Sequence, residues 1–157
     1  MTNIQLAQLH TTYAQVGEGP PVVWIAGGGG HGSDWEADYA AAFADSYRST
    51  TFENRGTVGT RCDVPLPWTV ADMAADTAEL IEAVCDAPAV IVGHSLGALI
   101  MLQLAAQRPD LVELGISLAG AARGDQAGSA TTCARKSPSD GMARGSSRHS
   151  RPPTTPR

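Results

Sequence analysis

The sequence predicts an α/β domain in which a mostly parallel sheet carries helices on both faces. Two continuous apolar runs, residues 22–26 and 89–92, are typical of strands that are buried on both sides. Two stretches with helical patterning, residues 70–85 and 96–107, alternate with them along the chain. Strands that alternate with helices favour parallel pairing. The length of 157 residues and an apolar content of 43% suit one domain with its own core.

The first elements of the chain are extended. Residues 4–16 alternate loosely between apolar and polar side chains and include β-branched and aromatic ones, so they predict a leading pair of strands. The glycines and prolines at 17–21 predict a turn before the strand at 22–26. Residues 35–43 are rich in alanine and predict a helix, and residues 47–52 predict the next strand.

The most regular helical pattern begins after Thr69. The spacing Thr69-x-x-Asp72 is typical of a helix start. Apolar or small side chains then recur at intervals of three and four, which marks one buried face: Val70, Met73, Ala74, Thr77, Leu80, Ile81 and Val84. Residues 96–107 are apolar nearly all round, as expected of a helix buried against a sheet, and residues 114–118 predict a last strand.

The composition changes abruptly near residue 123. Residues 124–157 contain no Val, Ile, Leu, Phe, Trp or Tyr, so they cannot build a core. We therefore predict one domain at 1–122 and a disordered, basic tail rich in Ser, Arg and Pro at 123–157. The abruptness also suggests a truncated or frameshifted reading frame.

Charge divides at the same boundary and bears on partners. Residues 1–122 hold four arginines against 14 acidic residues, a net charge of −10, whereas residues 123–157 have a net charge of +5. An acidic body argues against a nucleic-acid partner, and no aromatic residues interleave with the basic tail. We expect a small-molecule substrate instead, and the sequence does not predict an oligomeric state.

Cysteine spacing and hydropathy bear on the compartment. Cys62, Cys85 and Cys133 are far apart and form no C-x-x-C pair, so neither a disulfide framework nor a zinc site is indicated. The start Met1-Thr2-Asn3 carries no basic residue, and no apolar run approaches the roughly 18 residues of a membrane span. We expect a cytoplasmic protein with no membrane partner and no metal.

The strongest motif is Gly93-His94-Ser95-Leu96-Gly97, which matches G-x-S-x-G. It lies between the β-branched run at 90–92 and the helical stretch that begins at Leu96. A strand that turns abruptly into a helix pushes a serine side chain outward, and small residues are needed where the backbone is crowded. This context predicts that Ser95 is a nucleophile.

With this motif, residues 4–122 resemble the N-terminal half of an α/β-hydrolase, of the kind that includes cofactor-free haloperoxidase-like esterases and lactonases. Four features stand in the family's order: the strand at 22–26 entering a glycine loop, Glu53-Asn54-Arg55-Gly56-x-x-Gly59, the helix at 70–85, and the motif around Ser95. One position departs from the pattern. Ala26 precedes Gly27 where members of the family commonly carry histidine, and we expect a modest effect.

The resemblance implies a reaction and a set of site residues. Ser95 would attack an ester or a related carbonyl through an acyl-enzyme, and the backbone amides of Gly28 and Leu96 would hold the oxyanion. His31 and His94 are candidates for the substrate pocket. This chemistry needs no metal and no organic cofactor.

The acid and base of the triad are not identified. The family places them after the nucleophile, first Asp or Glu and then His. Beyond Ser95 this sequence offers only Asp110, Glu113, Asp125, Asp140 and His149. Asp110 lies in an expected turn and His149 in the expected tail. The resemblance thus implies an incomplete fold that lacks its last strands, exposes residues 114–118 at the sheet edge, and is weakly active or inactive.

Two alternatives remain. Gly27-x-Gly29-x-x-Gly32 matches the G-x-G-x-x-G pattern of a dinucleotide-binding oxidoreductase, and Glu53 ends the next strand where a ribose-binding acid would lie. That interpretation leaves the motif around Ser95 unexplained, so we favour the hydrolase. The second alternative is a non-catalytic, ligand-binding remnant.

Overall fold

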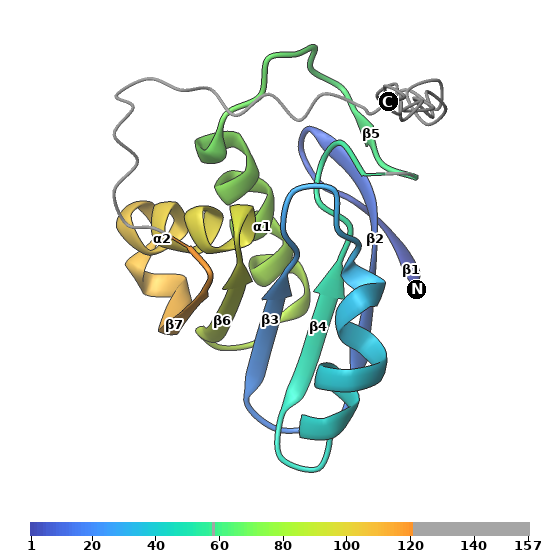
Figure 1. Ribbon diagram of the computed structural model, residues 1–157, viewed down its shortest axis with the longest axis vertical. Coiled ribbons are helices and arrows are strands. Elements are labelled where there is room, and N and C mark those ends of the chain that lie inside the picture. Colours follow the sequence, from blue (N-terminus) through green and yellow to red (C-terminus); the bar gives the residue numbers. More distant parts are fainter. Residues whose placement is uncertain (58, 121–157) are drawn as a thin grey trace, which may run out of the picture.

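The computed structural model describes residues 1–57 and 59–120 of the chain. A seven-stranded sheet forms their centre, with the strand order β1-β2-β4-β3-β6-β7 and with β5 attached to β2 (Figure 1). The strands are β1 (Thr2–Gln5), β2 (Leu9–Val16), β3 (Pro21–Ile25), β4 (Arg48–Phe52), β5 (Arg61–Cys62), β6 (Ala89–His94) and β7 (Val112–Leu118). The tail predicted at 123–157 lies outside the described residues.

Helices follow the strands and differ in length. The two α-helices are α1 (Val70–Val84) and α2 (Leu96–Gln107). Shorter helical turns are η1 (Gly32–Trp35), η2 (Glu36–Ala40), η3 (Ala41–Phe43) and η4 (Pro109–Leu111). Strands β4, β3, β6 and β7 pair in parallel, whereas β1, β2 and β5 add antiparallel pairs. The predicted α/β class is confirmed, with a sheet that is mixed and has a parallel half.

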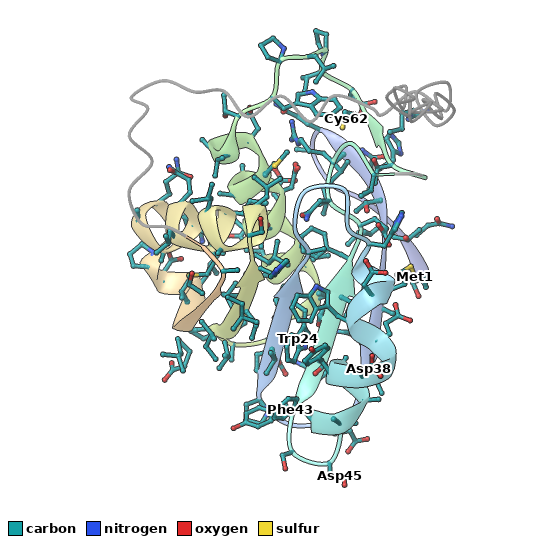
Figure 2. All side chains as sticks on the ribbon, in the orientation of Figure 1. Met1, Trp24, Asp38, Phe43, Asp45 and Cys62 are labelled. Atoms are coloured by element: carbon teal, nitrogen blue, oxygen red, sulfur yellow. The ribbon has the colours of Figure 1, made fainter. Side chains whose placement is uncertain are left out.

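Helices cover both faces of the sheet, as predicted. Alternate side chains of a strand point to opposite faces, which explains why β3 is apolar throughout. Val23 and Ile25 belong to the larger core beneath α1 and α2. Val22 and Trp24 belong to a second cluster with Trp35 from the η1–η3 side. Figure 2 shows Trp24 on the side of the sheet where the η helices lie. The ring centroids of Trp24 and Phe43 are 5.9 Å apart.

The start of α1 follows from its capping residues. The Asp72 amide donates a hydrogen bond of 3.2 Å to Thr69 Oγ1, and the Asp72 carboxylate accepts one of 2.6 Å from the Thr69 amide. These bonds satisfy amides that lack acceptors in the first turn of a helix. The Thr69 backbone and side-chain hydrogen bonds lower the pKa of the Asp72 carboxyl below its ordinary value.

One predicted helix takes an irregular form. Residues 32–43 are helical, but a 3₁₀ turn, a π turn and a second 3₁₀ turn replace the expected α-helix over 35–43. Trp35 and Ala40 are both buried against the sheet although they are five residues apart. An α-helix would separate them by about 140° around its axis, whereas an i→i+5 turn brings them towards one face. Burial of both side chains therefore favours the wider turn.

Strand β7 lies at one edge of the sheet and is largely exposed. In the part of the chain that the structure describes, it pairs with β6 and with no other strand. Leu114 is 55% exposed, and Ile116 and Leu118 are also exposed. An exposed apolar edge was expected at these residues. Among the described residues, no helix has the length and apolar character that crossing a membrane requires.

Candidate active site

The candidate site forms where two parallel neighbours, β3 and β6, end. Ile25 pairs with Gly93 in the register of these strands. Their arrowheads point to the same edge of the sheet in Figure 1, so the loops that follow them start side by side. The loop after β3 contains the glycines at 27–30, and the turn after β6 contains Ser95. The topology thus brings together the two motifs that the sequence separates by more than 60 residues.

Ser95 occupies a strained turn between β6 and α2. Its φ of 52° and ψ of −111° place a non-glycine residue in a region that L-amino acids rarely adopt. Such conformations cost roughly 1–3 kcal/mol and persist only when the surroundings enforce them. The Ser95 side chain is exposed and does not cap α2. Its hydroxyl is therefore held outward and is not used to stabilise the helix.

The glycines on either side of Ser95 are required by close backbone contacts. A Cβ atom on Gly93 would lie 2.2 Å from the carbonyl oxygen of Gly97. A Cβ atom on Gly97 would lie 2.2 Å from the carbonyl oxygen of Ile25. Both distances are far inside van der Waals contact, so any side chain would force the backbone apart. The outer glycines of the motif thus allow β3, β6 and α2 to approach closely.

The glycine loop packs directly on this turn. A Cβ atom on Gly27 would lie 3.3 Å from Ser95 Cβ, and one on Gly28 would lie 3.6 Å from Leu96 Cδ2. Leu96 is the first residue of α2, where amides have no acceptor within the helix. The structure therefore brings Gly28, Ser95 and Leu96 together. Backbone amides in such a place can hold a developing negative charge.

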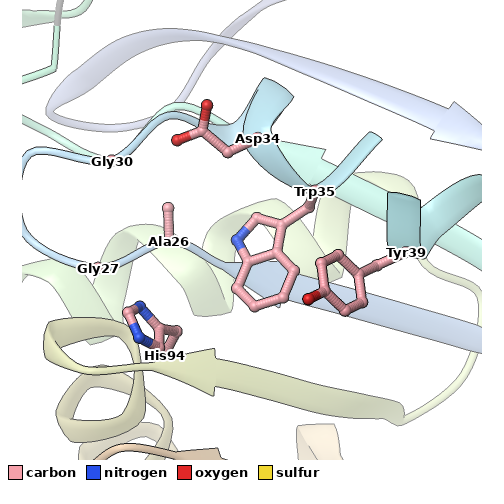
Figure 3. Close-up of a pocket in the computed structure, with 7 residues that line it drawn as sticks. All are labelled: Ala26, Gly27, Gly30, Asp34, Trp35, Tyr39 and His94. Atoms are coloured by element: carbon pink, nitrogen blue, oxygen red, sulfur yellow. The ribbon is translucent and has the colours of Figure 1, made fainter. Parts of the chain in front are cut away.

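A cavity of about 360 Å³ opens beside the turn. Its lining residues are Ala26, Gly27, Gly30, Asp34, Trp35, Tyr39 and His94. Figure 3 shows the Trp35 and Tyr39 rings next to each other, with His94 at the end of β6 facing Trp35. The ring centroids of Trp35 and Tyr39 are 5.1 Å apart, and those of Trp35 and His94 are 6.4 Å apart. Ala26, at the position where the family commonly has histidine, forms part of the wall.

His31 is not among the residues that line this cavity. Its Nδ1 lies 3.2 Å from Oε2 of Glu53, whose other oxygen accepts a 3.0 Å hydrogen bond from the Gly32 amide. The Glu53 side chain is only 8% exposed. Both of its oxygens thus have partners inside the protein, so Glu53 is not placed as the ribose-binding acid of the dinucleotide alternative. The loop also leads into a helical segment that begins with a 3₁₀ turn and a π turn, and not into the regular α-helix of a dinucleotide site.

A buried ion pair fixes the segment after β4. Arg55 Nε and Nη2 donate hydrogen bonds of 2.6 and 2.7 Å to the two carboxylate oxygens of Asp76 in α1. Both residues are buried. Burial lowers the pKa of the Arg55 guanidinium, but the Asp76 hydrogen bond and charge outweigh that effect and raise it above the ordinary value. Arg55 therefore stays charged and anchors residues 53–55 to α1.

The other candidate acids and bases lie elsewhere. His10 is in β2, 3.4 Å from Asp63. Asp110 is exposed in η4, and a hydrogen bond from Arg108 lowers the pKa of its carboxyl. Glu113 is exposed in β7. Asp125, Asp140 and His149 lie outside the described residues. Within 1–57 and 59–120, no group of three or more His, Cys, Asp or Glu side chains is arranged to hold a metal ion.

Several comparisons place this geometry among known proteins. A model of the alpha/beta hydrolase family matches residues 22–156. A protein of Mycobacterium tuberculosis H37Rv that is named as a non-heme bromoperoxidase, BpoC, is 42% identical over 120 residues, which cover 76% of this chain and 45% of that protein. A protein of Enterobacter cloacae that is named as a carbamate hydrolase, RutD, is 40% identical over 101 residues, which cover 64% of this chain and 38% of that protein.

A solved structure supports the same family relationship. The crystal structure of BpoC from M. tuberculosis superimposes with a TM-score of 0.67 at 41% identity, covering 74% of this chain and 43% of that one. The chain therefore spans less than half the length of the relatives that it matches.

Proposed function

The chain belongs to the alpha/beta hydrolase family, and from this premise we propose that it carries the nucleophile and the oxyanion-binding amides of a serine hydrolase. Ser95 is the nucleophile, and the N–H groups of Gly28 and Leu96 bind the oxyanion. The observation that carries the proposal is the strained turn that holds Ser95 outward, with the glycine loop packed against Ser95 and Leu96. Strain of this kind clusters at functional sites.

The proposed reaction begins with attack of Ser95 Oγ on a carbonyl carbon. The new O–C bond pushes the carbonyl electron pair onto oxygen, where the Gly28 and Leu96 amides stabilise the negative charge. Collapse of this intermediate breaks the bond to the leaving alcohol, which takes up the proton that Ser95 Oγ lost in the attack, and leaves the acyl group on Ser95. Water then attacks the acyl-enzyme, releases the acid and returns the proton to Ser95.

The proton of Ser95 needs a base, and we assign none among the described residues. His94 lines the cavity but directly precedes Ser95 in the chain. The His31 ring contacts the carboxylate of Glu53. In a productive complex, the accepting atom of the base must lie within about 2.6–3.2 Å of Ser95 Oγ. We propose that this chain alone is at most weakly active.

The substrate class is an ester or a related acyl compound. The carbamate in the name of RutD has a carbonyl carbon of the same kind, so the relative supports this class. In support of this class, the cavity is lined by the aromatic rings of Trp35 and Tyr39 and by His94, the residue before Ser95. These walls suit a small acyl group with an apolar or flat surface. A cytoplasmic location remains a proposal from the spacing of the cysteines.

Labelling with a fluorophosphonate tests the assignment of the nucleophile. The full chain is incubated with excess reagent for hours, and the modified peptide is identified by mass spectrometry. We expect slow modification of Ser95 and none in Ser95→Ala. Ser33→Ala is a matched control, because Ser33 is also exposed and lies in η1 next to the cavity residue Asp34. Modification that persists in Ser95→Ala contradicts the proposal, and binding without modification favours the non-catalytic alternative.

A further inference from the structure

We propose that Glu53 and Asn54 are positioning residues that hold the glycine loop at 27–30 in the shape that its oxyanion role requires. The inference rests on the proposed function in one respect, namely that the Gly28 amide binds the oxyanion. The two residues are adjacent at the end of β4, and they reach the two ends of the loop. Neither side chain belongs to the reaction steps described above.

Asn54 holds the beginning of the loop. Its Nδ2 donates a hydrogen bond of 3.1 Å to the carbonyl oxygen of Ala26, the residue just before the glycines. Asn54 is only 6% exposed, so water does not compete strongly for this bond. The bond fixes the direction in which the chain leaves β3.

Glu53 holds the end of the loop. One carboxylate oxygen accepts the hydrogen bond from the Gly32 amide, and the other faces the His31 ring. A buried carboxylate that accepts a backbone N–H forms a stronger bond than a neutral acceptor would. The carboxylate therefore fixes the point where the loop enters η1.

The loop needs such support because it has almost none of its own. Four consecutive glycines, Gly27 to Gly30, bring no side chains to pack and lose the most conformational entropy on ordering. Gly29 has a φ of +78°, and a Cβ atom there would meet nothing within 4 Å. Within the loop, the Gly30 amide donates a 3.1 Å hydrogen bond to the Gly27 carbonyl. The hydrogen bonds from Asn54 and Glu53, together with the packing of Gly27 and Gly28 on Ser95 and Leu96, then fix where the Gly28 amide points.

The attachments are themselves rigidly held. The Glu53 amide donates a 3.0 Å hydrogen bond to the Thr12 carbonyl, and Thr11 Oγ1 donates a buried one of 2.6 Å to the Glu53 carbonyl. On the other side, Arg55 forms the buried ion pair with Asp76 of α1. Residues 53–55 thus form a rigid segment that connects β2 and α1 to the glycine loop.

Backbone ¹⁵N relaxation of the full chain tests this support without reference to reactivity. In wild type, the order parameter of Gly28 should be near that of ordered backbone, about 0.85. In Glu53→Ala and in Asn54→Asp it should fall below about 0.6. Glu53→Gln keeps an acceptor for the Gly32 amide, so it should restore most of the order. Asp72→Asn, which weakens the cap of α1, is a control that lowers stability without loosening the loop.

The rate at which Ser95 is labelled measures how loop order affects the reactivity of Ser95. Without an assigned base, the residual reactivity of Ser95 depends on the oxyanion amides. Loss of one oxyanion donor typically lowers rates by about 10²–10³-fold. We expect the phosphonylation rate of Glu53→Ala to fall by about 10²-fold, with Glu53→Gln close to wild type and Asp72→Asn unchanged at a temperature where it is folded.

The two proposals fail in different ways. Order parameters that stay unchanged in Glu53→Ala and Asn54→Asp would overturn the positioning role, even if Ser95 is labelled. A loosened loop with an unchanged rate of Ser95 labelling would also overturn it. If no variant is labelled at Ser95, the nucleophile assignment fails, and relaxation still decides whether these residues order the loop.

Discussion

The backbone amide of Ser95 donates a hydrogen bond of 2.8 Å to the carbonyl oxygen of Leu118, the last residue of β7. This bond ties the candidate nucleophile to the edge strand of the sheet. A residue with a φ of 52° stays in place only when several contacts enforce its conformation. The geometry of Ser95 therefore depends on β7 as well as on the turn between β6 and α2.

Substitution of Gly97 should damage the turn. In Gly97→Ala, the new Cβ would overlap the Ile25 carbonyl oxygen, so we expect a loss of about 3 kcal/mol in the free energy of unfolding. Gly28→Ala is the matched control, because its Cβ would lie 3.6 Å from Leu96 Cδ2, an ordinary contact. Equilibrium urea unfolding measures both variants. Equal stability of Gly97→Ala and wild type would contradict the close contact between Gly97 in α2 and the Ile25 carbonyl oxygen in β3.

Loss of the buried ion pair should be severe. Asp76→Asn leaves the Arg55 guanidinium buried without its charged partner, and we expect a cost of about 3–5 kcal/mol. Arg108→Gln is the comparison, since Arg108 pairs with Glu82 and Asp110 at the surface and its loss should change stability little. Both effects can be read from urea midpoints. Similar midpoints for the two variants would contradict the buried character of the pair.

The cap of α1 should make stability depend on pH. The pKa of Asp72 is lowered in the folded protein, so its contribution is present above the ordinary carboxyl pKa of about 4 and is lost as pH falls further. At pH 7 we expect Asp72→Asn to cost about 0.5–1 kcal/mol. The difference from wild type should shrink between about pH 5 and pH 3. A constant difference across this range would show that the Asp72 charge is not involved.

Much of the fold could be predicted because its signals are local. The apolar runs gave β3 and β6, the spacing after Thr69 gave α1, and the strand–motif–helix order located the turn at Ser95. The exact form of the helix at residues 35–43 was harder to predict. Their composition favours a regular helix, whereas burial of both Trp35 and Ala40 on the sheet gives a wider turn. The two-residue strand β5 is too short to leave a pattern.

The role of Glu53 shows why part of the site was missed. From sequence, an acid at the end of a strand after a glycine loop fits a ribose-binding residue. In the structure its carboxylate turns inward to the Gly32 amide and His31. The direction of the Glu53 side chain depends on where the fold places residues 31–32, which are more than 20 residues away in the chain. An acid directly after a predicted strand was the one signal available in the sequence.

The full chain should hydrolyse esters slowly at best. Removal of the base from a serine triad lowers the rate by about 10⁴–10⁶-fold, and no base is assigned among the described residues. The measurement is hydrolysis of a short-chain p-nitrophenyl ester by purified protein, with Ser95→Ala and His149→Ala as controls. Robust turnover that disappears in both variants would show that Ser95 and His149 meet, and would overturn this prediction.

The central claim is that Ser95 is a nucleophile held ready in a site where no base is assigned among the described residues, and acylation in a hybrid protein tests it most directly. Residues 1–120 are joined to the second half of BpoC, the relative with 42% identity. After rapid quenching with p-nitrophenyl acetate, we predict an acetyl group on the peptide that contains Ser95 and turnover at least about 10⁴-fold above that of the full chain. The Ser95→Ala hybrid should show neither. A folded hybrid that turns over equally well with Ser95→Ala, or that carries the acetyl group on another residue, would contradict the claim.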